Sequence, residues 1–437
     1  MTAPFPLSNT RRLVLFGLAA GAAQVAGCGG GGGDLAGIGS GGTGSFTTGV
    51  ITGLGSIIVN GVRYDDSGVT PVADDDSTAS RSALVPGMVV TVEGSGRTPA
   101  TKVGGLPKAV AYRITYGSEW KGPVAGIARS TTAGVTTGTF TMLGQPVAVS
   151  ATTIFTGLIN RFDDLSDDDS VPVHYVEAYG FVDQTTGQLQ ATLIEVKSSL
   201  QEYKLSGKLT AFDRTGATAL LGPAPSGTAL TMTWTGADVA GENIGVGTFV
   251  RIRLNPTPVS AGVYTATKIR RQGPRAPETG RHERYDAELE GVVTDFVSPT
   301  LFSVNGVAVN ATQARIEGTV AAGVRVEAKG RVENGVLIAT EVEVKTAESI
   351  REEDSNRDFE FHGSIVSVTP SGATSGSFVL RPEGAADDTR NQTITYDNLT
   401  DFDDGATRAS LTVGASLEVK AVRAGAGWRA VKIELDD

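Results

Sequence analysis

Clustered aspartates in short loops are the residues whose type and spacing best suit chemistry. The densest cluster consists of Asp163, Asp164, Asp167, Asp168 and Asp169. Ca²⁺ prefers several carboxylate oxygens on a flexible loop, so this cluster is the candidate for a weak calcium site. Aspartate is also common in turns because its side chain bonds to nearby backbone. We favour solvated turns as the interpretation and keep the calcium site as the alternative.

Other reactive residues give little sign of catalysis. His174, His282 and His362 lie far apart, so a zinc site would need carboxylates from distant segments. The sequence holds no Gly-x-Ser-x-Gly elbow, His-Glu-x-x-His motif or P-loop. Two loop carboxylates could serve a glycosidase, but only 6% of the residues are aromatic, and sugar clefts usually stack rings on aromatic side chains. We expect no enzyme and no cofactor beyond weakly bound Ca²⁺. The alternative is a carbohydrate-active or cation-dependent enzyme that uses the loop aspartates.

The single cysteine, Cys28, follows what looks like an export signal. Arg11 and Arg12 precede the apolar run 13–23, which is shorter than the roughly 20 residues that cross a bilayer. A basic start and a short apolar core are typical of a signal peptide, which is removed from the mature protein. The paired arginines also fit a twin-arginine signal, so that route and the general secretory route both remain open. With no second cysteine, the chain forms no intramolecular disulfide.

The residues around Cys28 resemble the bacterial lipobox, an aliphatic residue and two small residues before a cysteine. Here these are Val25, Ala26 and Gly27. The resemblance implies that the leader 1–27 is cut off, and that the thiol receives a diacylglycerol and the new amine an acyl chain. Several acyl chains anchor a protein stably where one holds it marginally. Gly29 in place of aspartate implies, by resemblance to proteobacterial lipoproteins, an outer-membrane location that is periplasmic or surface-facing.

The charge of the chain excludes some partners. Its net charge of −11 makes it a poor ligand for nucleic acid, because phosphate binding needs Lys and Arg charge. An acidic chain is also not expected to bind an anionic lipid surface by its own charge. The acyl chains must therefore provide the membrane anchor. One segment, 270–286, carries five arginines and could contact an anionic envelope polymer. The segment fits an exposed linker or a long terminal strand with a charged extension, and we favour a solvated role over a polymer contact because isolated charge runs are usually solvated.

The mature chain repeats a strand pattern, and such a period outweighs any local assignment. Each repeat opens with a glycine in a strand-like run, and the spacing between these glycines is 72 to 85 residues. The opening glycines are Gly49, Gly122, Gly207, Gly291 and Gly363. Two repeats continue to an Asn-Gly pair, at 60–61 and 305–306, which is the dipeptide of tight hairpins. Each repeat closes on Ala-x-x-Ile or Ala-x-x-Val.

These patterns predict an all-β chain. Alternating apolar residues and an abundance of Val and Thr favour strands, and five or six strands per repeat suffice to close a small barrel without exposed edges. We predict tandem small β-barrels of the oligonucleotide/oligosaccharide-binding type, with tandem small β-sandwiches as the alternative. The predicted segments are a signal peptide 1–27, a lipidated cysteine with a glycine-rich tether 28–45, and β units 46–118, 119–203, 204–286, 287–358 and 359–437.

Two runs resemble a known bacterial family. They are GVITGLGSIIVNGVRY at 49–64 and GMVVTVEG at 87–94. The family consists of exported proteins and lipoproteins built of tandem β-rich units, grouped as a domain of unknown function. The resemblance is strong over 46–200, moderate over 289–345 and weak in the third and fifth repeats. It implies small barrels and assigns no catalytic residue.

Together these features predict a non-enzymatic lipoprotein of the cell envelope. Its acyl chains would hold it to the membrane, and its repeated barrels would form a binding or scaffold array. The partners that we expect are envelope proteins or glycans.

Overall fold

The computed structural model describes residues 44–436 except 75–77, 101–104, 133, 168–173, 184–186, 223–228, 235–238, 240–242, 272–284, 347–357, 386–387 and 426. The leader, the lipobox and Cys28 therefore lie outside the described residues. The described chain consists of strands and loops with short 3₁₀ turns, which are η1 (Arg81–Ala83), η2 (Phe162–Asp164), η4 (Asp388–Arg390) and η5 (Arg408–Ser410). Within this described part, no helix has the length and apolar character that a membrane crossing requires.

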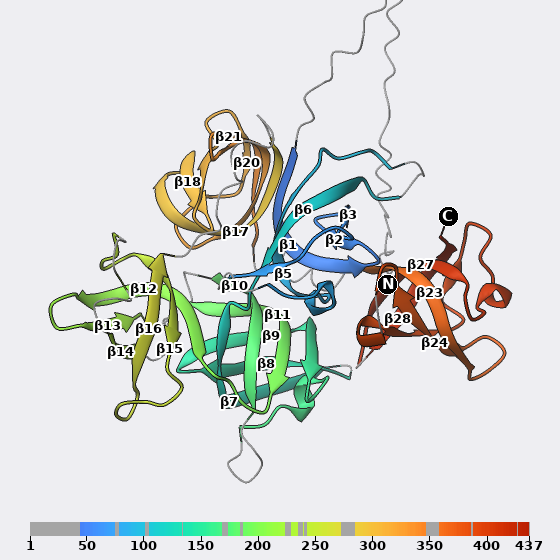
Figure 1. The fold of residues 1–437 in the computed structure, drawn as a ribbon, viewed down its shortest axis with the longest axis horizontal. Coiled ribbons are helices and arrows are strands. Elements are labelled where there is room, and N and C mark those ends of the chain that lie inside the picture. The colour runs from blue at the N-terminus through green and yellow to red at the C-terminus, as the bar shows by residue number, and fades with distance from the viewer. Residues whose placement is uncertain are drawn as a thin grey trace, which may run out of the picture. The chain divides into compact units, whose positions relative to one another are not determined.

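Five barrels follow one another along the chain, coloured from blue to red in Figure 1. Barrel 1 contains β1 (Gly44–Leu54), β2 (Ile57–Val59), β3 (Val62–Asp65), β4 (Val72–Ala73), β5 (Val89–Gly94) and β6 (Lys108–Tyr116). Barrel 2 contains β7 (Trp120–Thr132), β8 (Val135–Met142), β9 (Gln145–Gly157), β10 (Tyr175–Asp183) and β11 (Gln188–Lys197). Barrel 3 contains β12 (Tyr203–Asp213), β13 (Thr218–Leu221), β14 (Leu230–Trp234), β15 (Phe249–Leu254) and β16 (Val263–Arg271).

The last two barrels each include a short extra strand, as barrel 1 does. Barrel 4 contains β17 (Tyr285–Ser298), β18 (Leu301–Val304), β19 (Val307–Asn310), β20 (Arg315–Glu317), β21 (Arg325–Glu333) and β22 (Val336–Val344). Barrel 5 contains β23 (Phe359–Pro370), β24 (Gly376–Pro382), β25 (Gln392–Tyr396), β26 (Asp401–Phe402), β27 (Ser416–Ala424) and β28 (Gly427–Leu435). The extra strands β4, β20 and β26 run parallel to the final strand of their barrel.

The same pairing closes every barrel. In barrel 1, β1, β2 and β3 form an antiparallel meander, and β3 runs parallel to the final strand β6. The strand β5 then pairs with both β6 and β1 and completes the ring. This is the strand order of the oligonucleotide/oligosaccharide-binding barrel, a five-stranded Greek key. The prediction of tandem small barrels is confirmed, and the alternative of open sandwiches is wrong because the first strand closes each ring.

First strands also join one barrel to another. The first half of β1 runs parallel to β17 of barrel 4, and its last residues run parallel to β23 of barrel 5. Barrels 2 and 3 meet where β7 pairs with β12. A barrel of this size buries only a modest core. The apolar side chains accordingly form clusters that cross barrel boundaries, one shared by barrels 1 and 5 and another by barrels 2 and 3.

The opening glycine and the Asn-Gly turn form one structural device. In barrel 4, Asn305 lies at φ 48°, and its Oδ1 accepts a hydrogen bond from Val292 N at 2.9 Å. Its Nδ2 donates to the carbonyl of Glu290 at 3.4 Å. A Cβ at Gly291 would lie 2.2 Å from that Nδ2, so only glycine leaves room for the asparagine. The two motifs therefore occur together because the turn packs onto the strand.

We predict that Gly291→Ala loosens barrel 4. The new methyl group would displace the Asn305 side chain and break its bond to Val292 N, a loss of about 1–2 kcal/mol. Hydrogen exchange of peptides from residues 289–310 should then accelerate about 5- to 30-fold. The control is Gly245→Ala, where an added Cβ meets nothing within 4 Å. Equal exchange in the Gly291 variant and the wild type would contradict this account.

Candidate functional site

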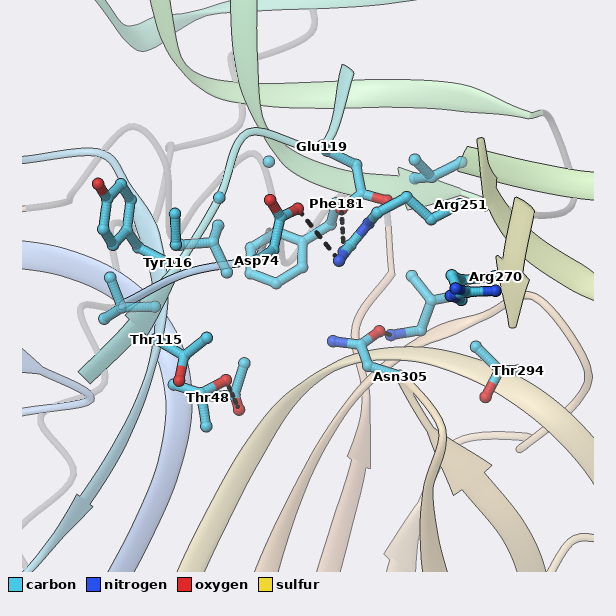
Figure 2. A pocket seen from close by; sticks show the side chains of 18 of the residues that line it. Thr48, Asp74, Thr115, Tyr116, Glu119, Phe181, Arg251, Arg270, Thr294 and Asn305 are labelled. Carbon is cyan, nitrogen blue, oxygen red and sulfur yellow. Dashed lines mark hydrogen bonds and ion pairs between the residues drawn. The ribbon is translucent and has the colours of Figure 1, made fainter. Parts of the chain in front are cut away.

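A cavity of about 340 Å³ is lined by strands of barrels 1, 2, 3 and 4 (Figure 2). Barrel 1 supplies parts of β1, β5 and β6, and barrel 3 supplies β15 and β16. Barrels 2 and 4 add β10 and β17. We call this space the junction cavity. Its size lies within the range of about 300–1,000 Å³ that small-molecule sites occupy.

Barrel 3 gives the junction cavity a cationic wall. The buried residues Val250, Ile252 and Leu254 alternate with arginines along β15, so the arginines point away from the barrel core. The strand register sets Arg251 opposite Arg270 and Arg253 opposite Lys268. Like charges directly opposite one another destabilise a sheet. This arrangement therefore needs negative charge nearby, and Asp74, Glu119, Glu202 and Asp295 supply such charge. The cationic wall consists of Arg251, Arg253, Lys268, Arg270 and Arg271.

Asp74 supplies part of that negative charge from barrel 1. Its Oδ2 lies 2.6 Å from Lys204 Nζ and 3.1 Å from Arg251 Nη1, and its Oδ1 lies 3.2 Å from Arg253 Nη2. Lys204 is fully buried. Burial lowers the pKa of Lys204 to about 8, although the Asp74 carboxylate opposes the shift. Burial alone would raise the pKa of Asp74, but the three cations outweigh burial and hold that pKa below its usual value.

Glu119 completes the ionic network between barrels 2 and 3. Its Oε2 lies 3.7 Å from Arg251 Nη2, and its Oε1 accepts a hydrogen bond from Ser206 Oγ. Trp120 Nε1 donates to Ser206 Oγ at 3.1 Å, so the buried indole fixes the serine. Figure 2 shows Asp74, Glu119 and Arg251 gathered together at the cavity.

The rest of the lining is hydroxylic and aromatic. Thr48 Oγ1 and Thr91 Oγ1 lie 3.1 Å apart, and Asn305, the turn residue of barrel 4, lies on the same side of the cavity as Thr294 in Figure 2. The ring of Phe181 contributes an apolar surface and stacks 4.2 Å from the guanidinium carbon of Arg325. Among the described lining residues there is no histidine, cysteine or serine. The junction cavity is therefore equipped to hold an anion with hydroxyl groups.

The predicted calcium ligands lie elsewhere, in the segment between β9 and β10. Asp164 pairs with Arg161 at 3.1 Å, and Asp167 Oδ2 accepts from Ile127 N at 3.0 Å. Asp163 is exposed beside them, whereas Asp168 and Asp169 lie outside the described residues. Within the described residues these aspartates form no group with metal-ligand spacing. The calcium site stays a prediction, as does lipidation at Cys28 with processing at Val25, Ala26 and Gly27.

Sequence reasoning missed the junction cavity. The alternation Arg251-Ile252-Arg253 shows that arginines face outward, but it does not show which segments face them. For Arg270 and Arg271 the alternative of a long terminal strand holds and the solvated linker does not, because β16 extends through Arg271 and both residues line the cavity. No local pattern marks Asp74 as their counter-charge.

Comparison with known proteins gives a family match in three of the five barrels. The family described as "Domain of unknown function (DUF5666)" matches residues 121–195, 290–343 and 362–434, which fall in barrels 2, 4 and 5. The matched segments include the fifth repeat, where the sequence resemblance was weak, and do not include the first, where it was strong. No curated protein matches the chain. A solved structure described as "drosophila Unr CSD456" is 13% identical, with 55% of this chain and 98% of that chain covered and a TM-score of 0.14. A TM-score this low carries no argument.

We predict that Asp74→Ala and Lys204→Met differ sharply in their effect on stability. Asp74→Ala leaves a buried ammonium without its carboxylate, which costs about 3–5 kcal/mol. Lys204→Met removes the buried charge, while Asp74 keeps Arg251 and Arg253, so its cost should stay below about 1.5 kcal/mol. Urea denaturation followed by tryptophan fluorescence measures both. Equal destabilisation by the two substitutions would refute the assignment of Lys204 as the group that depends on Asp74.

The pH dependence provides the control for Lys204. Its pKa is about 8 in the folded chain and near 10.5 when unfolded, so the unfolded state holds more protons between these values. Stability relative to Lys204→Met should therefore rise as the pH increases from about 8 to 10.5. A flat difference would show that the lysine is not desolvated.

Proposed function

We propose that this chain, three of whose repeats match the DUF5666 family, is a non-enzymatic binding protein of the cell envelope and that its junction cavity holds an anionic glycan. The five barrels would act as a scaffold that builds one composite site from several similar units. A binding function fits the strand order, since barrels of this type commonly bind oligomeric ligands on their surfaces.

The cationic wall of the junction cavity carries this proposal. The whole chain has a net charge of −11, yet five cationic side chains of barrel 3 face one cavity. Four of them lie opposite one another on two paired strands, Arg251 with Arg270 and Arg253 with Lys268, and like-charge pairs of this kind cost free energy in the absence of an anion. Asp74, Glu119, Glu202 and Asp295 offset charge on Arg251, Arg253 and Arg271. A carboxylate or sulfate group of a ligand would offset more.

The remaining lining favours a glycan over a nucleic acid. Glu93, Asp74 and Glu119 also border the junction cavity and would repel a uniformly charged phosphate backbone. Thr48, Thr91, Thr115, Thr294 and Asn305 offer donors and acceptors for sugar hydroxyls. Phe181 and Tyr116 give rings against which a sugar face can pack. One or two acidic sugar units would suit a cavity of about 340 Å³.

Anchoring completes the proposal. A lipid on Cys28, followed by the glycine-rich segment 29–45, would tether the barrels to the outer membrane. The tether would let the junction cavity reach polymers at some distance from the leaflet.

The binding proposal predicts that Lys268→Gln combined with Arg270→Gln weakens an acidic glycan at least tenfold. The loss of two cations from the cationic wall removes charge-assisted hydrogen bonds to the carboxylates. Isothermal titration of trigalacturonate into the protein measures the change, and binding to the wild type should weaken as salt increases.

The matched control is Arg315→Gln combined with Arg331→Gln, two exposed arginines of barrel 4 outside the junction cavity. This control should bind trigalacturonate as the wild type does. Tighter binding of an oligothymidylate than of trigalacturonate would favour a nucleic-acid partner instead and defeat the proposal. Equal binding of trigalacturonate by the two double variants would also contradict the proposal.

The anchoring proposal predicts that Cys28→Ser releases the protein from membranes. Without the thiol no acyl chain can be attached, and an acidic mature chain is not expected to bind an anionic lipid surface by its own charge. Fractionation of expressing cells should find the wild type in the membrane pellet after a high-salt wash and the variant in the soluble fraction. Retention of the serine variant in the pellet would show that another feature holds the chain.

A further inference from the structure

Barrel 5 carries a histidine between two carboxylates on its outer face. Glu360 and His362 are two residues apart on β23, so their side chains share one face of the strand. The antiparallel register sets Glu418 of β27 directly opposite His362. One ligand atom from each of these three residues lies within 4.8 Å of the other two. In the part of the chain that the structure describes, this is the one group with such spacing.

The triad is held in place by its burial. His362 is 3% exposed and Glu360 is 8% exposed, while Glu418 is half-buried. The Nε2 atom of His362 lies 2.8 Å from Glu360 Oε1, so the imidazole edge faces the carboxylates. Lys420 approaches from the next pair of the ladder, 3.8 Å from Glu360 and 4.0 Å from Glu418.

The opposite edge of the imidazole meets a further carboxylate. Asp436 Oδ1, beyond the end of β28, lies 3.3 Å from His362 Nδ1. A histidine that binds a metal through one nitrogen commonly donates its other N–H to a carboxylate, which orients the ring and makes it a better ligand. Asp436 lies outside the triad and provides this partner.

Arg63 of barrel 1 also reaches His362 Nδ1, at 3.0 Å. This contact and the contact from Asp436 require different proton positions, since the arginine can only donate and the carboxylate can only accept. Arg63 has other partners, the carbonyl of Gly55 at 2.8 Å and Glu383 at 2.6 Å. The proton can therefore lie on Nδ1, facing Asp436, while Arg63 remains bound through its other bonds. Nε2 then presents its lone pair to the two glutamates.

We propose that Glu360, His362 and Glu418 form a site for a divalent transition metal, best suited to Zn²⁺. Imidazole with carboxylates is a ligand set for zinc and its neighbours, whereas Ca²⁺ takes oxygen ligands alone. Three protein ligands leave a fourth position for water or a ligand group. Glu434, which stands opposite Glu418 in the β27–β28 register, and Asp436 add negative charge that offsets the positive charge of Arg63 and Lys420. The site is independent of the junction cavity and of the glycan proposal.

The test is zinc titration of the metal-free, detergent-solubilised full chain without a polyhistidine tag. Calorimetry should find one zinc site per chain, and Zn²⁺ should raise the melting temperature. Either His362→Gln or Glu418→Gln should weaken zinc binding more than 100-fold, and Asp436→Asn should weaken it 10- to 100-fold. Glu418→Gln keeps the shape of a half-buried side chain, so it remains informative if the histidine variant misfolds.

The control is His174→Gln in barrel 2, which removes a histidine outside the triad and should leave zinc binding unchanged. Cobalt substitution adds an independent readout, because a low-coordinate Co²⁺ site absorbs visible light and the Glu418 variant should lose that absorption. Zinc affinity that is equal in wild type, His362→Gln and Glu418→Gln would overturn the proposal. Equal binding of Ca²⁺ and Zn²⁺ by the wild type would overturn the choice of metal.

Discussion

The association of barrels 1, 4 and 5 depends on one strand, which pairs with different neighbours along its two halves. The first half of β1 lies between β5 of its own barrel and β17 of barrel 4. Its second half pairs with β2 and then with β23 of barrel 5. A strand changes partners in this way only where its backbone can bend and be approached closely, which is where Gly49 and Gly53 lie. At Gly53 a Cβ would lie 2.3 Å from the carbonyl oxygen of Glu360. The contact between barrels 1 and 5 therefore requires glycine at this position.

The same constraint explains why charged side chains lie between the barrels. Once first strands pack against other barrels, their outward-facing residues can no longer face water. Lys204 on β12 is an example, since it is fully buried and depends on Asp74 of another barrel. An isolated buried ammonium would be costly, so the loop that carries Asp74 must stay docked. The junction cavity is the space left between these docked surfaces, which is why its walls come from four barrels.

The sequence predicts the barrels well because their information is local. Alternation along β15 and the Asn-Gly turn at 305–306 specify strands and hairpins from neighbouring residues, and repetition of the pattern identifies the unit. The sequence does not predict the junction cavity or the triad of barrel 5, because both depend on contacts between distant segments. Asp74 meets Lys204 across 130 residues, and Glu418 meets His362 only through barrel closure. The Glu-x-His pair at 360–362 was the available signal, but two ligands on one strand do not show what stands opposite.

One pair of equivalent positions in the repeats lies within the proposed metal site of barrel 5 and, in barrel 3, contacts Asp74 and Glu119 of the junction cavity. In the first strands of barrels 3, 4 and 5, the residues one and three positions before the opening glycine face away from the barrel, while the residue between them enters the core. In barrels 3, 4 and 5 these outward residues are all buried and polar, namely Lys204 and Ser206, Glu288 and Glu290, and Glu360 and His362. Barrel 4 neutralises its pair with Lys329 and Arg325. Barrel 3 makes its pair part of a cationic network, and barrel 5 makes its pair two-thirds of a metal-ligand set. In these three barrels the inward residues Leu205, Leu289 and Phe361 fill the core and are apolar, whereas the outward pair contacts the neighbouring barrel that covers it. Repetition of one fold thus supplies the same buried position several times, and each copy is free to acquire different chemistry.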